Sequence, residues 1–338
     1  MANIILPKDW QLKGLRPTEE SIYHNRRSFV KQLGLLGIGA VAAPGLLSAC
    51  NSPQSAASKA GAMQDGDVPG FHFDGEEDFY PAARNPKFVL DRKITDKYDA
   101  THHNNFYEFI NPADRNIYNV YKYIGAFDTS DWKIEVNGLC EKPGEYHLAD
   151  LIKKIGLEER TYRFRCVERW AMAVPWTGFS LASLLKEFGP QNNATHVRFT
   201  TALNKKQMIG VKGQSWYPWP YREGLRMGEA MNEVAFMATG LYGKPLEKQN
   251  GAPIRLVVPW KYGYKNIKSI SKIEFLDKEP KTFWHQIAPR EYPFISNVDP
   301  DVPHPRWSQA RERQIPNGDW EPTLKYNGYG DMVAKLYS

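Results

Sequence analysis

The sequence predicts a mixed α+β fold that is largely β, and three observations carry that prediction. Apolar residues make up 42% of the 338 residues, which is enough for a substantial core in one large domain. Aromatic residues are abundant, with 10 Trp and 18 Tyr, and 24 Pro and 26 Gly are scattered along the chain. Short segments with strand or helix periodicity alternate with long loops rich in Pro and aromatic residues. This combination is typical of a loop-rich domain built on a mixed sheet.

Strands are predicted where apolar residues alternate with polar ones or form short β-branched runs. Trp132, Ile134 and Val136 alternate in this way, which predicts a strand ending at Asn137-Gly138. The same reasoning predicts strands at 197–200, 254–258 and 270–275, and a strand at 162–165 that ends at Cys166 and leads into a loop over 167–176.

Two segments have helical spacing of their apolar residues. The first covers 148–155 and is stopped by Gly156, and the second covers 179–188 and is ended by Gly189-Pro190. Both are short, which agrees with a fold in which sheets supply most of the core.

The first 49 residues have the features of a signal peptide. Residues 24–31 contain a paired arginine followed by x-Phe-aliphatic-Lys, the twin-arginine export pattern. The apolar stretch at 33–49 is short and interrupted by Gly and Pro. These features are typical of the apolar region of a signal peptide and not of a membrane-spanning helix. The alternative is a buried helix preceded by surface arginines. Because the twin-arginine route exports folded proteins, we expect a cofactor inserted before export to the periplasm.

Two cleavage sites compete after this segment. Leu47-Ser48-Ala49-Cys50 resembles a lipobox, and cleavage there would leave a lipid on Cys50 that tethers the protein to a membrane. Cleavage at Ala60-Gly61-Ala62 would release a soluble protein. We favour lipidation, with 50–70 as a flexible tether and 71–338 as one catalytic domain.

Charge and cysteine content exclude some classes of protein. The net charge of +6 falls without residues 1–49, which hold six basic and three acidic residues and leave 38 basic against 35 acidic. No concentrated basic run is present, so nucleic acid is not an expected partner. The three cysteines, Cys50, Cys140 and Cys166, are well separated and do not form a disulfide pattern.

Cys166 is the centre of the first chemical cluster. It ends a strand and is followed by Glu168 and two tryptophans, and it is flanked by Arg165 and Arg169. These arginines would lower the pKa of the thiol, as a soft-metal ligand or a nucleophile requires. On spacing alone, a lone cysteine is more often a small buried apolar residue.

Two further clusters suit a polar, phosphorylated cofactor. The segment 102–109 contains two adjacent histidines, which we interpret as satisfied loop residues, followed by Asn, Tyr and Glu that can hydrogen-bond a heteroaromatic ring. The segment 249–268 alternates basic residues with small turn-forming ones and can bind a phosphate. It can also be a solvated basic loop. No Walker-type or Rossmann glycine pattern is present.

Together these segments resemble the sulfoxide-reductase branch of the sulfite-oxidase molybdopterin superfamily, from about residue 85 to the C-terminus. The resemblance is carried by five ordered blocks, which are Asn104-Asn105-Phe106-Tyr107-Glu108-Phe109, Arg165-Cys166-Val167-Glu168 with Val174-Pro175-Trp176, Gln249-Asn250-Gly251-Ala252-Pro253, Pro259-Trp260-Lys261-Tyr262-Gly263 and His304-Pro305-Arg306-Trp307-Ser308-Gln309. It implies a largely β sulfite-oxidase-type fold and a molybdenum-molybdopterin cofactor.

The resemblance also implies roles for individual residues. Cys166 matches the cysteine that binds molybdenum through sulfur, and Glu168 and Trp307 fall where a substrate pocket is expected. The positions that match residues holding the pterin and its phosphate are Asn104, Tyr107, Glu108, Thr201, Asn250, Arg255, Asn266, Ile267 and Lys268. Cys140 matches nothing functional and is expected to be a structural or free thiol.

The implied reaction is reduction of methionine sulfoxide, free or in oxidised periplasmic proteins, by a monomeric catalytic subunit. Electrons would come from a membrane haem-containing subunit, and Glu168 would handle protons or order water. A sulfite-oxidase-like activity is the enzymatic alternative, but an arginine run expected after the cysteine is replaced by residues 168–172, which suit a neutral substrate. A non-catalytic, cofactor-binding lipoprotein is the second alternative.

Overall fold

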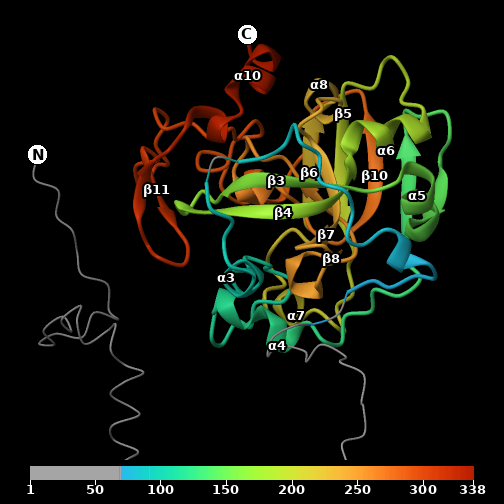
Figure 1. Ribbon diagram of the computed structural model, residues 1–338, viewed down its shortest axis with the longest axis horizontal. Helices are drawn as coiled ribbons and strands as arrows, with labels where there is room; N and C mark the ends of the chain where they lie inside the picture. The colour runs from blue at the N-terminus through green and yellow to red at the C-terminus, as the bar shows by residue number, and fades with distance from the viewer. Residues whose placement is uncertain (1–67, 69, 91) are drawn as a thin grey trace, which may run out of the picture. The chain divides into compact units, whose positions relative to one another are not determined.

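The structure is a computed structural model that describes residue 68, residues 70–90 and residues 92–338. The predicted signal peptide over 1–49 lies outside these residues, and so does the predicted tether over 50–70 except for Val68 and Gly70. The described part is built on two sheets with short helices around them (Figure 1). It is therefore mixed and mostly sheet, as predicted.

The smaller sheet has five strands in the order β2-β1-β10-β5-β6. Strands β1 and β10 run parallel and the other neighbours are antiparallel. The strands of this sheet are β1 (Lys133–Gly138), β2 (Gly144–His147), β5 (His196–Thr201), β6 (Arg222–Arg226) and β10 (Ile270–Leu276). The strands predicted at 132–138, 197–200 and 270–275 are thus confirmed.

The larger sheet contains seven strands and is organised around β4, which pairs with β3, β7 and β11. Figure 1 shows β3 and β4 as two long neighbouring ribbons. The strands of this sheet are β3 (Glu158–Arg165), β4 (Trp170–Ser180), β7 (Phe236–Leu241), β8 (Lys244–Pro245), β9 (Arg255–Val257), β11 (Arg311–Gln314) and β12 (Trp320–Pro322). The predicted strand at 254–258 corresponds to β9.

The loop predicted over 167–176 is wrong for most of its length. Strand β4 begins at Trp170, so the connection from β3 is a tight turn over 167–169. Residues 170–179 are buried on both faces of the strand. A strand covered on both faces has no apolar and polar alternation, and the sequence therefore carried no strand signal there.

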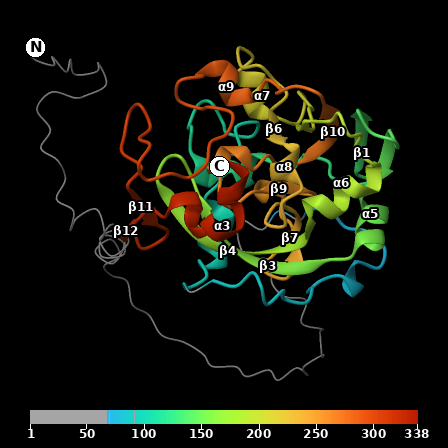
Figure 2. The ribbon, with the colours of Figure 1, turned by 90° about the horizontal axis from the view of Figure 1, so that it is seen from above.

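Short helices connect and cover the sheets (Figures 1 and 2). The α-helices are α3 (Lys97–His102), α4 (Val120–Tyr123), α5 (Leu148–Ile155), α6 (Leu181–Phe188), α7 (Ile209–Gly213), α8 (Met227–Ala230), α9 (Phe283–Ile287) and α10 (Gly330–Val333). The 3-10 helices are η1 (Glu76–Asp78), η2 (Ile117–Asn119), η3 (Lys248–Asn250), η4 (Gly263–Lys265), η5 (Lys325–Gly328) and η6 (Ala334–Leu336). In the part of the chain that is described, no helix is both long and apolar enough to cross a membrane.

The two predicted helices are found, one with a corrected start. Helix α5 has the predicted bounds and ends at Gly156, whose positive φ of 79° favours glycine. Helix α6 begins two residues later than predicted, because Ser180 is its N-cap and its Oγ accepts a hydrogen bond from the backbone N–H of Ser183 at 3.1 Å. Phe179 therefore belongs to β4.

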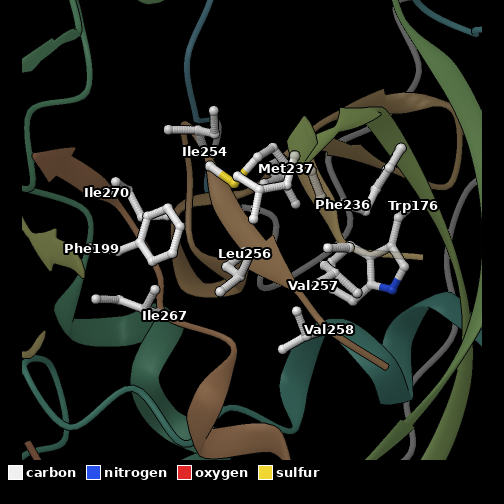
Figure 3. Close-up of a cluster of buried hydrophobic side chains, with 14 of the residues drawn as sticks. Trp176, Phe199, Phe236, Met237, Ile254, Leu256, Val257, Val258, Ile267 and Ile270 are labelled. Atoms are coloured by element: carbon white, nitrogen blue, oxygen red, sulfur yellow. The ribbon is translucent and has the colours of Figure 1, made fainter. Parts of the chain in front are cut away.

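The core extends from the larger sheet to the segment that follows β9. Figure 3 shows the side chains of β9 at its centre, with Trp176 on one side and Phe199 on the other. Leu256, Val257 and Val258 are fully buried there. This packing fixes the backbone in the middle of residues 249–268, the segment predicted to bind a phosphate. Cys140 is buried and free, as expected.

Candidate active site

One cavity collects side chains from stretches of the chain that are distant in sequence. The stretches that carry the predicted residues are the segment after α3, the turn between β3 and β4, the end of β5, the segment from η3 into β9, and the segment from η4 towards β10. Eleven of the twelve site residues predicted from the sequence line this cavity, and they are Asn104, Tyr107, Glu108, Cys166, Glu168, Thr201, Asn250, Arg255, Asn266, Ile267 and Lys268. The structure therefore brings these predicted residues together.

Cys166 is placed in the cavity by the turn between β3 and β4. Its backbone N–H donates to the carbonyl of Trp170 at 2.9 Å, and its own carbonyl accepts from the N–H of Arg169 at 3.0 Å. Arg169 has a φ of 73°, the left-handed conformation that allows such a tight reversal. The side chain of Cys166 is 5% exposed. The end of a rigid strand pair thus presents one buried sulfur to the cavity.

Glu168 and Asn105 surround the sulfur of Cys166. The Glu168 carboxylate Oε2 lies 3.8 Å from Cys166 Sγ and accepts hydrogen bonds from Asn105 Nδ2 at 2.9 Å and from Trp170 Nε1 at 3.1 Å. Asn105 Nδ2 also lies 3.8 Å from the sulfur. The carboxylate is therefore held beside the sulfur by two donors, one of them on a segment more than sixty residues away in sequence.

Arg165 lowers the pKa of Cys166 as predicted, but its effect is outweighed, and Arg169 is not among the causes of the shift. The Arg165 guanidinium is shared with other acceptors, because it also binds Glu312 Oε2 at 3.2 Å and Gln309 Oε1 at 2.8 Å. The Arg169 guanidinium lies over the ring of Trp320 at 5.0 Å. Burial and then the neighbouring Glu168 raise the pKa of the Cys166 thiol well above its ordinary value. A bound metal cation is the kind of group that would reverse this effect.

Arg255 is a buried cation whose hydrogen-bond partners in the described residues are carbonyl oxygens. Its side chain donates to the carbonyl of Asn250 at 2.9 Å and to that of Asn266 at 3.3 Å, and its Nε has no partner there. Burial lowers the pKa of Arg255 to about 9. Because a buried guanidinium without an anion is costly, this geometry fits the phosphate of a bound cofactor.

Glu108 and Lys268 are two more charged groups at the cavity. Burial raises the pKa of Glu108 to about 7. Burial and then the charge of Arg255 lower the pKa of Lys268 to about 7. The Lys268 ammonium donates to the carbonyl of Asn105 at 3.0 Å. Lys268 therefore joins the Asn105 segment to the phosphate segment, and an anion near Arg255 would favour its charged form.

Several predicted cofactor-binding side chains also hold the cavity wall together. Thr201 Oγ1 donates to the Lys268 carbonyl at 2.8 Å, and Asn266 Oδ1 accepts from the Val258 N–H at 2.7 Å. Gly251 has a φ of 103°, and a Cβ there would lie 2.9 Å from the Lys268 side chain. The wall from 250 to 268 is thus closely packed, and Ile267 lines the cavity together with its polar neighbours Asn266 and Lys268.

Trp307 lies outside the set of residues that line the cavity. Its Nε1 donates to the carbonyl of Val167 at 2.8 Å, and Gln309 Nε2 donates to the same oxygen at 2.8 Å. Its ring stacks on His304 with centroids 3.9 Å apart. Trp307 therefore packs on His304 and is hydrogen-bonded to the turn that carries Cys166.

Asn105 and several aromatic residues also line the cavity, although none of them was predicted as a site residue from the sequence. The aromatic residues include Tyr264, Trp284 and Tyr292. Asn105 stands inside a block quoted for the resemblance, but its importance comes from its contact with Glu168, which local sequence cannot reveal. The aromatic residues come from loops whose path no periodicity predicts.

The two adjacent histidines are partly satisfied. His102 Nδ1 donates to the Tyr98 carbonyl at 2.8 Å, whereas the Nε2 atoms of His102 and His103 have no partner among the described residues. Burial lowers the pKa of His103 to about 4. Within that part of the chain, no three His, Cys, Asp or Glu side chains gather as a metal-binding group. The donor set at the cavity is therefore one thiol with polar groups suited to an organic cofactor.

Comparisons with known proteins agree with this donor set. A family described as "Oxidoreductase molybdopterin binding domain" matches residues 121–284. The "Protein-methionine-sulfoxide reductase catalytic subunit MsrP" of Pseudomonas syringae pv. tomato is 44% identical over 327 residues, covering 95% of this chain and 93% of that protein. The protein of the same name from Xanthomonas campestris pv. campestris is 49% identical over 265 residues, covering 76% and 80% respectively.

A solved structure is similar at a lower level. The sulfane dehydrogenase SoxCD from Paracoccus pantotrophus aligns with a TM-score of 0.40 and 20% identity, covering 59% of this chain and 46% of that chain. This similarity is too low to support an argument about function.

Proposed function

Because this chain belongs to the family of protein-methionine-sulfoxide reductase catalytic subunits, MsrP, we propose that it reduces methionine sulfoxide to methionine with a molybdenum-molybdopterin cofactor. The observation that carries the proposal is the buried sulfur of Cys166 in a cavity that also contains the unneutralised guanidinium of Arg255. A thiolate is a suitable ligand for a soft metal, and a guanidinium is a suitable partner for a phosphate.

Different residues around the cavity bind different parts of the cofactor. Cys166 provides the metal ligand, and Arg255 and Lys268 bind the phosphate. The pterin is held by the remaining predicted residues, which are Asn104, Tyr107, Glu108, Thr201, Asn250, Asn266 and Ile267. When bound, the molybdenum centre supplies the two-electron oxygen-atom chemistry at sulfur.

Glu168 is suited to manage protons in this reaction. Reduction of methionine sulfoxide breaks the S–O bond, consumes two electrons and two protons, and yields the thioether and water. The Glu168 carboxylate is exposed, lies 3.8 Å from Cys166 Sγ and is oriented by Asn105 and Trp170. It can therefore accept protons from solvent and deliver them next to the reacting centre.

The same carboxylate argues against sulfite as the substrate. A negative charge beside Cys166 repels an anionic substrate, while Arg165 and Arg169 are turned towards Glu312 and Trp320. A neutral sulfoxide meets no such repulsion.

Location and partners are part of the proposal. The twin-arginine pattern at 24–31 supports export to the periplasm, and Cys50 would carry a lipid if the lipobox is used. The relatives are called catalytic subunits, which supports a separate electron donor, and we assign that role to a membrane haem protein. Oxidised periplasmic proteins and free methionine sulfoxide are the proposed substrates of a monomeric catalytic subunit.

Activity of the isolated holoenzyme tests the proposal. The protein is purified from a molybdenum-replete host with an intact twin-arginine route, and methionine formation is measured with reduced viologen as electron donor. Wild type and Cys140→Ser are expected to produce methionine, whereas Cys166→Ser is expected to be inactive. A folded, molybdenum-free wild type would instead favour a non-catalytic lipoprotein.

Glu168→Gln tests the role of the carboxylate. The amide preserves a hydrogen-bond acceptor for Asn105 and Trp170 but removes the proton-carrying group. We expect normal molybdenum content and a fall in kcat of about 10²-fold or more, the range of a lost general acid. An unchanged kcat would remove Glu168 from the mechanism.

A further inference from the structure

Aromatic rings form a continuous run from the cavity to the surface of the protein. Tyr107, Trp284 and Tyr292 line the cavity, and the Trp284 ring lies 4.9 Å from that of Tyr107 and 5.2 Å from that of Tyr292. Outside the cavity, the Tyr217 ring lies 6.1 Å from Trp284 and 5.9 Å from Trp216. Trp216 ends the run and is 70% exposed. Trp284 lies on α9, and Trp216 and Tyr217 lie shortly after α7. Figure 2 labels these two helices near each other.

The loop that carries Trp216 is held rigidly by contacts that do not involve the Trp216 ring. Trp219 Nε1 donates to the Gln214 carbonyl at 2.8 Å, and the Trp219 N–H donates to the Tyr217 carbonyl at 2.8 Å. The Trp219 ring packs 4.9 Å from the buried Phe283. The loop is therefore preorganised, and its most exposed ring is available to a ligand.

Trp216 contributes little to the core and leaves a large apolar face in water. It has the highest exposure of the large apolar side chains in the described part of the chain. Large aromatic faces that stay exposed on a rigid loop commonly mark binding surfaces, because burying them on binding is favourable. Its connection to the cavity through Tyr217 and Trp284 indicates what would bury it.

We propose that Trp216 and Tyr217 form an exosite for the polypeptide that flanks a methionine sulfoxide residue, while the sulfoxide side chain occupies the cavity. The proposal rests on the proposed function. Three successive ring contacts of 4.9, 6.1 and 5.9 Å separate Tyr107 from Trp216. An extended chain advances only about 3.3–3.6 Å per residue, so a free amino acid in the cavity does not reach Trp216 but a polypeptide does.

The exosite makes the enzyme favour methionine sulfoxide within a chain over the free amino acid. Aromatic faces stack on peptide groups and on apolar side chains without requiring one sequence, which suits damage at varied positions. Trp216→Ala is expected to raise the KM for a peptide containing methionine sulfoxide by about threefold to tenfold. Because Trp216 does not face the cavity, kcat and the KM for free methionine sulfoxide should not change.

The experiment compares the two substrates in the same holoenzyme preparations. Wild type, Trp216→Ala, Trp216→Phe and Val89→Ala are assayed with reduced viologen, which bypasses any protein donor. Val89 is the control because it is another exposed large apolar side chain, at 58%, and does not line the cavity. Trp216→Phe should restore most of the peptide KM, and Val89→Ala should behave like wild type.

The outcomes separate this inference from the proposed function. A peptide KM that rises in Trp216→Ala alone supports the exosite. If wild type reduces free methionine sulfoxide but Trp216→Ala changes neither KM, or changes both equally, the exosite is wrong and the proposed function stands. If Trp216→Ala is normal with reduced viologen and defective only when a membrane electron donor replaces the viologen, this surface binds the donor and the exosite is wrong. Inactivity of wild type with both substrates would overturn both.

Discussion

At the scale of single residues, Arg165 and Arg255 are both buried, but their charges are balanced differently. Arg165 has Glu312 as an ion-pair partner at 3.2 Å, and both side chains are within the core. Arg255 has carbonyl oxygens as its partners in the described residues, and its Nε is unpaired. The first charge is compensated within the protein, whereas the second is a buried charge that an anionic ligand would compensate.

This difference predicts opposite effects for the same substitution. Arg165→Met breaks a buried ion pair and leaves Glu312 with only the longer ion pair to Arg92 at 3.4 Å, which should lower the free energy of unfolding by about 3 kcal/mol. Arg255→Met removes an uncompensated charge, so the apoprotein should keep its stability to within about 1 kcal/mol while molybdenum content falls sharply. Urea unfolding of apoprotein and metal analysis of holoprotein measure the two effects. Equal destabilisation by both substitutions would contradict this interpretation.

His103 predicts a pH dependence of stability. Burial lowers its pKa from 6.5 to about 4 in the folded protein. The lowered pKa means that folding favours the neutral imidazole. Below pH 6.5 the unfolded protein takes up a proton at His103 and the folded protein does not, so the free energy of unfolding falls as the pH drops from 6.5 towards 4. The loss over that window is about 3 kcal/mol. His103→Phe keeps a ring against Trp170, which lies 4.3 Å away, but removes the titration.

Unfolding free energies of wild type and His103→Phe at pH 7, 5.5 and 4 measure this contribution. Wild type should lose more stability than the variant as the pH falls, since other titrating groups affect both proteins alike. Parallel pH profiles would show that His103 does not contribute.

At the scale of secondary-structure elements, the start of α6 shows how one side chain sets a boundary. Apolar periodicity continues through Phe179, but Ser180 caps the helix and leaves Phe179 in β4. Ser180→Ala should lower the unfolding free energy by about 1 kcal/mol, because the N–H of Ser183 loses its acceptor. Ser180→Asp retains a capping acceptor and should be nearly neutral. Chemical denaturation of the three proteins checks this, and equal stability of the alanine variant would rule out the cap.

Elements with a clear one-sided pattern could be predicted from the sequence. Helix α5 and strand β1 each bury one face and expose the other, and a glycine marks the end of each. Strand β4 could not be predicted because it is buried on both faces. The role of Arg165 was also inaccessible, because the direction of its guanidinium depends on Glu312, which is 147 residues away in sequence.

At the scale of the whole described domain, the candidate site depends on contacts between distant segments. The two sheets and the core around β9 bring residues 104–108, 166–168, 201 and 250–268 to one cavity. Residue chemistry alone drew attention to Cys166 and to the segments 102–109 and 249–268, but left other interpretations of each open, and only the resemblance to a family joined them into one site and added Thr201. Asn105 and the run from Tyr107 to Trp216 became apparent only once the segments were assembled.

We propose that Cys166 binds molybdenum through sulfur, and X-ray absorption at the molybdenum edge of the holoprotein measures that coordination. Wild type and Cys140→Ser should give the same sulfur coordination shell, because Cys140 is buried in contact with the Pro190 backbone and is not among the residues that line the cavity. Cys166→Ser should lose one sulfur neighbour from the metal, or lose the metal altogether. A sulfur shell that is unchanged in metal-loaded Cys166→Ser would contradict the claim.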